Sequence, residues 1–174
     1  MRVLLIVVAA VLVGGCATTG ATPQPFPTGH RPIPSAHPAP VSARPEGAPA
    51  ASGYEISGTA LALRGVPYRL GGADPNGFDC SGLVWYVFGQ HGLALPRTVE
   101  DQFRVGGAID PSQLEAGDLV FFSTVTAGAS HVGIVIGGDS FIHAPSSNGV
   151  VRVERLGASY WAQRFLGARR ILSF

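Results

Sequence analysis

The sequence is poor in charge and in cysteine. Charged residues make up 13% of the 174 residues, the formal net charge is +1, and there are two cysteines. From Tyr54 to Phe174, arginines and acidic residues nearly balance and lysine is absent. A domain without a basic excess gives no indication of nucleic-acid binding. Two cysteines exclude a disulfide-rich scaffold and leave each thiol to be explained separately.

A long apolar run is also missing. Val3 to Val13 follow the positively charged Arg2, but this run is too short to span a bilayer, which takes roughly 20 residues. It suits the apolar part of a secretory signal, about 7–15 residues. Val13-Gly14-Gly15-Cys16 resembles a bacterial lipobox. That resemblance implies cleavage before Cys16 and lipid on its thiol; the alternative is a buried segment with Cys16 as a core thiol.

The signal and lipobox predict how the chain is divided and where in the cell the protein is located. Residues 1–15 are predicted to be a lipoprotein signal peptide. Ala17, rather than aspartate, follows Cys16, which resembles the outer-membrane class of Gram-negative lipoproteins. The expectation is an exported protein, held by lipid on Cys16 at the inner face of the outer membrane with its domain in the periplasm.

Most of the prolines stand between Cys16 and Gly53, among Ala, Thr, Ser and Gly. Such a segment buries too little apolar surface to offset the entropy of ordering. Residues 16–53 are therefore predicted to form a disordered, semi-extended tether. Tyr54 to Phe174 has the length of one globular domain.

Cys80 is the most informative residue of that domain. A turn-rich segment precedes it and the apolar run Leu83 to Phe88 follows it, which predicts that Cys80 begins a helix. The unpaired N–H groups of a first helical turn favour negative charge. A lowered pKa and partial thiolate character are therefore expected. If Cys16 carries lipid, Cys80 also lacks a disulfide partner.

Two histidines complete a set typical of cysteine hydrolases. His131 and His143 lie in apolar, strand-like contexts on either side of a tight turn at Gly137-Gly138-Asp139. Antiparallel pairing of these strands would bring the two rings side by side.

The rest of the pattern predicts an α+β domain with helices first and strands afterwards. The helices are expected at residues 55–63, 80–90 and 98–104. The strands are expected at residues 119–122, 131–136, 140–144, 150–153 and 165–172. Amino-terminal helices packed on an antiparallel sheet would result.

Several motifs together resemble the NlpC/P60 family of cell-wall cysteine peptidases. In chain order they are Val66–Gly72, Phe78–Val84, Gly117–Phe122, His131–Val135 and Phe141–Ala144. The resemblance implies a compact papain-like fold without a cofactor. It also implies a thiol endopeptidase of peptidoglycan stem peptides, of the lipoprotein type. The bond stays open: D-glutamate–diaminopimelate within a stem, or the D-alanine–diaminopimelate cross-link.

Each residue then has an expected role. Cys80 would attack the scissile carbonyl, His131 would act as general base, and His143 would orient His131. Tyr68 would help to bind the oxyanion. Asp79 and Ser81 match positions linked in the family to the free amine of the stem peptide, although Asp79 would equally serve as a helix N-cap.

The same residues are also compatible with other classes of function. Cys80, His131 and His143 are zinc-ligand types, but their spacings are long and no close pair is present, so no metal is predicted. A non-catalytic wall-binding module, and an amidase or acyltransferase of papain-like type, remain alternatives. A regulatory protein partner is not specified by the sequence.

Overall fold

The computed structural model describes residues 51–146 and 149–171. The predicted signal peptide, Cys16 and nearly all of the tether lie outside the described residues. Within those residues, no helix is long and apolar enough to cross a membrane.

The domain begins slightly earlier than expected. Helix α1 spans Gly53–Ala62, and Ser52 caps it. The Ser52 hydroxyl accepts the N–H of Glu55, while the Glu55 carboxylate accepts the N–H of Ser52. This reciprocal capping box stabilises the first turn, so ordered structure starts inside the segment predicted to be tether.

Six antiparallel strands form the main sheet in the order β3-β8-β4-β5-β6-β7. They are β3 (Gly107–Ile109), β4 (Leu119–Phe122), β5 (His131–Gly137), β6 (Ser140–His143), β7 (Arg152–Arg155) and β8 (Phe165–Arg170). A small hairpin is formed by β1 (Ala73–Asp74) and β2 (Gly77–Phe78). The helices after α1 are α2 (Cys80–Gln90), α3 (Val99–Gln102) and α4 (Ser159–Ala162), with a 3-10 turn at Pro111–Gln113.

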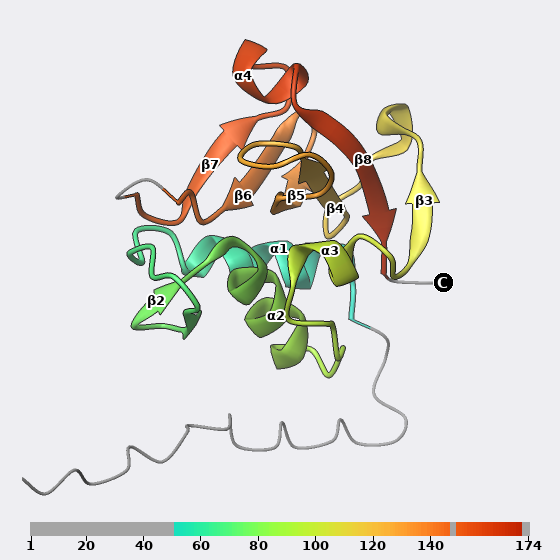
Figure 1. Ribbon diagram of the computed structural model, residues 1–174. Coiled ribbons are helices and arrows are strands. Elements are labelled where there is room, and N and C mark those ends of the chain that lie inside the picture. The colour runs from blue at the N-terminus through green and yellow to red at the C-terminus, as the bar shows by residue number, and fades with distance from the viewer. Residues whose placement is uncertain (1–50, 147–148, 172–174) are drawn as a thin grey trace, which may run out of the picture. The chain divides into compact units, whose positions relative to one another are not determined.

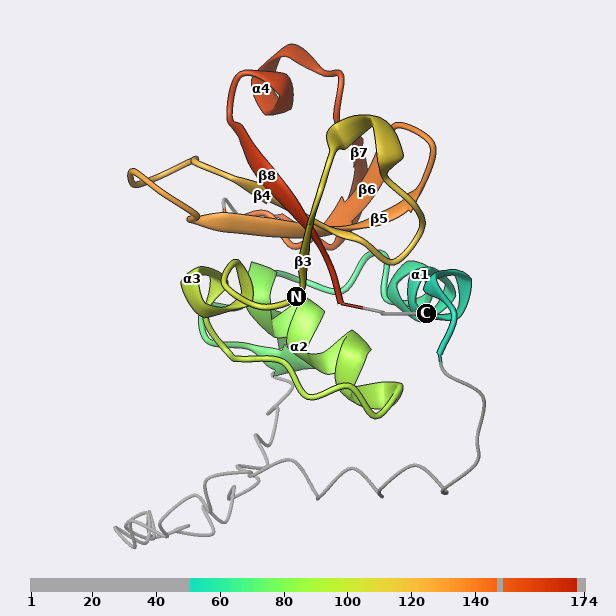
Figure 2. The same cartoon turned by 90° about the vertical axis from the view of Figure 1, so that its right-hand side faces the viewer.

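Helices α1, α2 and α3 lie on one side of the main sheet and α4 lies on the other (Figures 1 and 2). Strand β4 shows why both faces are covered, since all four of its residues are buried. Leu119 and Phe121 pack toward α1 and α2, whereas Val120 and Phe122 pack toward Trp161 of α4. Successive side chains of β4 point to opposite faces of the sheet, so this strand contributes to both apolar layers.

This architecture confirms the predicted α+β papain-like class. Helix α2 and strand β4 have the predicted bounds. Strand β7 starts two residues later than predicted, because Val150 makes an isolated bridge with Pro67 and the N–H of Val151 donates to the carbonyl of Val66. The short elements β3 and α4 were not predicted.

Candidate active site

Cys80 is the first residue of α2, and Asp79 is its N-cap. The Asp79 carboxylate accepts the N–H of Gly82 at 2.6 Å and the N–H of Gly71 at 3.0 Å. A Cβ on Gly82 would lie 1.9 Å from the carbonyl oxygen of Gly72. Glycine is therefore required at position 82, because the first turn of α2 packs directly against the Gly71-Gly72 loop.

The prediction of a lowered pKa at Cys80 was wrong. Burial, followed by the charge of Asp79, raises the pKa of the Cys80 thiol to about 11. The N–H groups of Ser81, Val132 and Cys80 act in the opposite direction, but their effect is smaller. Asp79 already supplies the negative charge that the helix start favours, so a second anion beside it is penalised.

The thiol nevertheless lies next to the histidine strand. The backbone N–H of Val132, which directly follows His131 in β5, lies near enough to Cys80 to lower the pKa of its thiol. Cys80 is a free cysteine with a partly exposed side chain. The fold thus joins the start of α2 to the start of β5, although the two are far apart in the sequence.

His131 and His143 lie in direct contact. The Nε2 of His131 is 2.7 Å from the Nδ1 of His143, and the rings are almost perpendicular. His131 stacks on Trp161, with ring centroids 5.4 Å apart and an interplanar angle of 23°. The edge of α4 therefore fixes the plane of the His131 ring, leaving its Nδ1 free of the His143 contact.

Both histidines are held neutral. Burial lowers the pKa of His131 to about 4. The pKa of His143 falls further, because burial, the neighbouring His131 and the positive Arg152 all disfavour its charge. In a neutral pair only one ring donates the shared proton. If His131 donates through Nε2, its Nδ1 is the basic nitrogen, and His143 carries its own proton on Nε2.

Among the described residues, the Nε2 of His143 is buried and has no hydrogen-bond partner. The His143 ring lies against two aromatic rings, with the centroids of Trp161 and Phe141 at 4.9 and 5.2 Å from its own centroid. An N–H facing an aromatic ring keeps a weak interaction, whereas a bare nitrogen acceptor would find none. The surroundings therefore favour the tautomer in which His131 Nδ1 is free to accept a proton.

Tyr68 is half-buried near the thiol. Its N–H donates to the carbonyl of Gly149. Burial, then the charges of Cys80 and Asp79, raise the pKa of Tyr68. The phenol therefore stays protonated at neutral pH and keeps an O–H to donate near Cys80.

Asp79 and Ser81 are committed to an internal cluster with Arg97. The Arg97 guanidinium donates to the Asp79 carboxylate at 2.9 and 2.7 Å, to the Ser81 hydroxyl at 2.9 Å and to the carbonyl of Gly72 at 3.0 Å. The Ser81 hydroxyl donates to Asp79 at 3.3 Å. These contacts give both residues a structural role at the start of α2.

Three residues outside the predicted set belong to this site. Arg97 and the fully buried Gln102 hold the first turn of α2, since the Gln102 amide donates to the carbonyls of Ser81 and Pro96. Trp161 covers the histidine pair. Polar residues flanking Cys80 at a buried helix start were the available signal for a partner such as Arg97. No feature of the sequence around Trp161 indicated that it packs against the histidine pair.

Metal binding has no geometric basis in the described part of the chain. No group of three or more His, Cys, Asp or Glu side chains there lies close enough to hold a metal ion.

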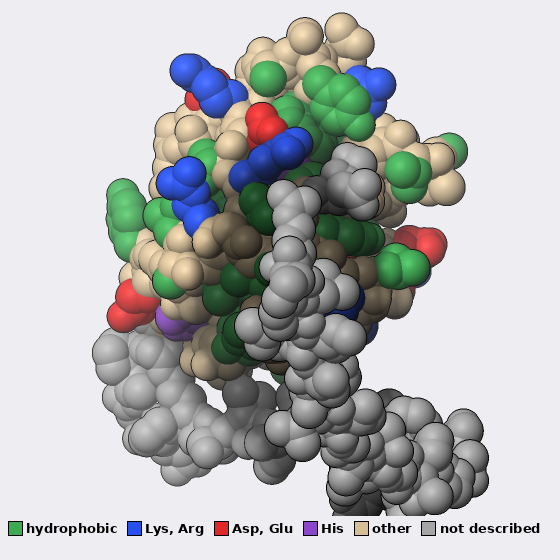
Figure 3. Space-filling model, turned by 90° about the vertical axis from the view of Figure 1, so that its left-hand side faces the viewer, with side chains coloured by type: hydrophobic (Ala, Val, Ile, Leu, Met, Phe, Trp, Pro, Cys, Tyr) green, Lys and Arg blue, Asp and Glu red, His purple; other side chains and the backbone are tan. Residues whose placement is uncertain are grey.

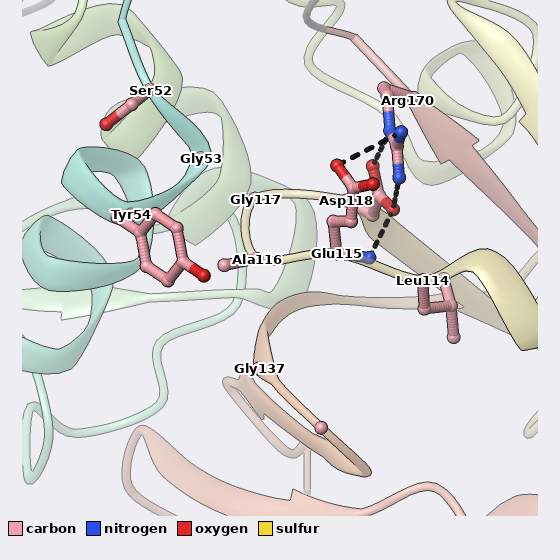
Figure 4. Close-up of a pocket in the computed structure, with 11 residues that line it drawn as sticks. Ser52, Gly53, Tyr54, Leu114, Glu115, Ala116, Gly117, Asp118, Gly137 and Arg170 are labelled. Carbon is pink, nitrogen blue, oxygen red and sulfur yellow. Dashed lines mark hydrogen bonds and ion pairs between the residues drawn. The ribbon is translucent and has the colours of Figure 1, made fainter.

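A hollow lies elsewhere in the domain, around Glu115, Asp118 and Arg170 (Figure 4). The Arg170 guanidinium bonds both oxygens of the buried Asp118 at 2.8 Å and also pairs with Glu115. These contacts tie the Glu115–Asp118 turn to β8. Its lining contains no cysteine or histidine, so it is not the site of thiol chemistry.

The sequence profile described as the NlpC/P60 family matches residues 65–170. The chain belongs to the NlpC/P60 family. The crystal structure of a family member from Bacillus cereus aligns with a TM-score of 0.69 and 32% identity, covering 72% of this chain and 42% of that one. The NlpC/P60 domain of the peptidoglycan hydrolase SagA aligns with a TM-score of 0.62 and 36% identity, covering 69% and 99%.

Curated relatives agree over the same region. A protein of Escherichia coli K12 named murein DD-endopeptidase MepS/murein LD-carboxypeptidase is 45% identical over 111 residues, 63% of this chain and 58% of that protein. The probable peptidoglycan endopeptidase LytE of Bacillus subtilis is 45% identical over 112 residues, 64% of this chain and 32% of LytE. The chain thus matches little more than half the length of the first relative.

Proposed function

We propose that this NlpC/P60 protein is a peptidoglycan endopeptidase that uses Cys80 as nucleophile, His131 as general base and His143 as orienting residue. The observation that carries the proposal is that the thiol lies near the backbone N–H of Val132, next to His131, while the far nitrogen of His131 contacts His143. Relatives named murein and peptidoglycan endopeptidases support the substrate class. The bonds attacked would be stem-peptide or cross-link amides involving diaminopimelate.

The pKa values determine how the reaction would begin. With the thiol pKa near 11 and the His131 pKa near 4, the resting pair is a neutral thiol and a neutral imidazole. The proton therefore moves to His131 Nδ1 as the Sγ–carbon bond forms. The oxyanion would be bound by the N–H of Cys80 and the O–H of Tyr68.

The intermediate then collapses. The carbon–nitrogen bond breaks, and His131 returns its proton to the leaving amine, which yields a free amine and a thioester on Cys80. Water, deprotonated by His131, hydrolyses the thioester and restores the thiol. His143 accepts the Nε2–H of His131 throughout and stabilises the imidazolium that forms transiently.

The test is digestion of purified diaminopimelate-type peptidoglycan by the protein and by a Cys80→Ala variant. Fragments identified by mass should appear with the wild type and be absent with the variant, and their masses name the bond. Wall binding without fragments from the folded wild type would instead indicate a binding module. Fragments cut at a non-peptide amide would indicate an amidase.

Export and lipidation complete the proposal. The chain would be processed before Cys16, lipidated on that thiol and held at the inner face of the outer membrane with its domain in the periplasm. Support comes from the sequence of residues 1–17. Metabolic labelling with a tagged fatty acid, compared with Cys16→Ser, tests the lipid, and membrane fractionation tests the location.

A further inference from the structure

Trp161, the third residue of α4, contacts both histidines of the candidate site. The residue is 7% exposed. The centroid of its ring lies 4.8 Å from that of Phe122 on β4 and 5.2 Å from that of Phe141 on β6. These packed rings hold the indole between the helix and the sheet, so its face keeps a fixed direction relative to the histidine pair.

The two histidines meet the indole in different ways. The His131 ring is nearly parallel to it, with centroids 5.4 Å apart and an interplanar angle of 23°. The His143 ring is nearly perpendicular to it, at 4.9 Å and 82°. A parallel ring that becomes charged places its charge against the negative face of the indole, whereas a perpendicular ring can direct an N–H at that face. One indole can therefore serve both histidines.

The imidazolium that would form on His131 has no carboxylate partner among the described residues. Its hydrogen-bonding neighbour is the neutral ring of His143. Burial lowers the pKa of His131, and no carboxylate of the described residues counteracts this effect. On the β7 side of the molecule, basic and acidic side chains lie beside one another (Figure 3), and the Glu154 carboxylate there is 2.9 Å from the Arg152 guanidinium. The face of Trp161 is therefore left to balance the positive charge.

The Nε2 of His143 also has no conventional acceptor. The residue is 0% exposed, and within the described residues this nitrogen has no hydrogen-bond partner. A buried N–H without an acceptor costs free energy, and an aromatic face accepts it weakly. With its proton on Nε2, His143 accepts from His131 through Nδ1, and the basic nitrogen of His131 is then its own Nδ1. An N–H directed at the indole therefore selects one of the two proton arrangements of the pair.

We propose that Trp161 is a positioning residue whose indole face accepts the Nε2–H of His143 and stabilises the positive charge that forms on His131. The proposal rests on the endopeptidase function proposed above. It gives an aromatic face part of the task that a carboxylate performs in a triad that ends in aspartate. The indole neither gives nor takes a proton, so the bonds made and broken remain those described for Cys80 and His131.

The experiment changes the electron density of the indole face and keeps its shape. Fluorine atoms on the ring withdraw electron density from the face that attracts a cation, and they alter its size little. The chain has two tryptophans, Trp85 and Trp161, so Trp85→Phe confines the label to position 161. This variant is produced with tryptophan or with analogues carrying one, two or three fluorine atoms. kcat and KM are measured on a diaminopimelate-containing stem peptide. The control is Trp161→Phe, in which the analogues enter at position 85.

The kcat of Trp85→Phe should fall with each added fluorine, to about 30-fold below the unfluorinated protein, while KM stays the same. A 30-fold loss corresponds to about 2 kcal/mol at ~1.36 kcal/mol per tenfold, the strength of a desolvated cation–π contact. Trp161→Phe should have one kcat with all the analogues. A kcat that does not depend on fluorine at position 161, or an equal graded loss in the control, would overturn the proposal.

Failure of the function and failure of the Trp161 role are separable. If the wild type cleaves no stem peptide, the endopeptidase proposal fails, and ¹⁵N NMR of the histidine rings at neutral pH decides the role of Trp161. In the wild type, His131 and His143 should both carry their proton on Nε2, whereas Trp161→Leu should show a mixture of tautomers. A wild-type spectrum with His143 protonated on Nδ1 rejects the role even if the leucine variant does not fold. Identical tautomers in wild type and folded variant reject it as well.

Discussion

The Nε2 of His131 lies 2.7 Å from the Nδ1 of His143, and the other ring nitrogen of His143 is buried among aromatic rings without a hydrogen-bond partner in the described residues. This relationship favours Nδ1 as the nitrogen of His131 that can act as a base. It also makes the pair sensitive to any change that charges or removes one ring.

The two histidines should respond differently to substitution. His131→Ala removes the proposed general base and should lower kcat by about 10²–10⁴. His143→Asn keeps an acceptor for the Nε2–H of His131 and should stay within about tenfold of the wild type, with His143→Ala more damaging. Steady-state peptide hydrolysis measures the order. A kcat for His143→Asn as low as that for His131→Ala would contradict an orienting role.

Acid should destabilise the fold through this pair. The folded-state pKa of each histidine is depressed below its unfolded value of about 6.5, so the unfolded chain binds protons first as the pH falls. Stability is therefore full above pH 6.5 and declines toward pH 4, by more than about 1 kcal/mol. Urea unfolding at pH 7 and pH 4.5 measures it.

The control for this effect is His143→Asn, which removes one depressed group and should flatten the decline between pH 6.5 and 4. A decline of unchanged size would show that other groups cause it.

The Cys80 thiol should lose its proton only at high pH. With Cys16→Ser present so that Cys80 is the remaining thiol, the rate of alkylation by iodoacetamide should rise with pH up to about 11. Asp79→Asn should move the midpoint down, because the carboxylate is the second cause of the raised pKa. A plateau already reached at pH 7 would indicate a preformed thiolate–imidazolium pair and refute the neutral resting state.

Arg97 should contribute more to the free energy of unfolding than its partial exposure suggests. Arg97→Gln removes the donors to Asp79, Ser81 and Gly72 and should cost about 1–3 kcal/mol of unfolding free energy. Arg97→Lys should not restore it, since an ammonium lacks the planar fork. The matched control is Arg104→Gln, whose exposed ion pairs with Glu100 and Asp101 should be worth at most about 1 kcal/mol. Equal losses in chemical denaturation would argue against the Arg97 cluster.

Features that depend on residues near one another in the chain agree with the sequence predictions. The bounds of α2 follow from its own cap and apolar run, and β4 from a run of buried apolar residues between turns. The contact between the histidines follows from two strands joined by a tight turn. All of these are set by residues near one another in the chain, so the sequence was sufficient to predict them.

What the sequence could not determine was the environment that distant segments create. The start of α2 suggested a low thiol pKa, but burial against β5 and the carboxylate of Asp79 raised it. Trp161 entered the site from a helix that was not predicted, and Arg97 entered it from the loop between α2 and α3, because side-chain partners and solvent exclusion depend on how the sheet and helices pack. The sequence by itself determined the fold class and named the candidate site residues. The tertiary structure decided the environment and orientation of those side chains, because both depend on packing between distant segments.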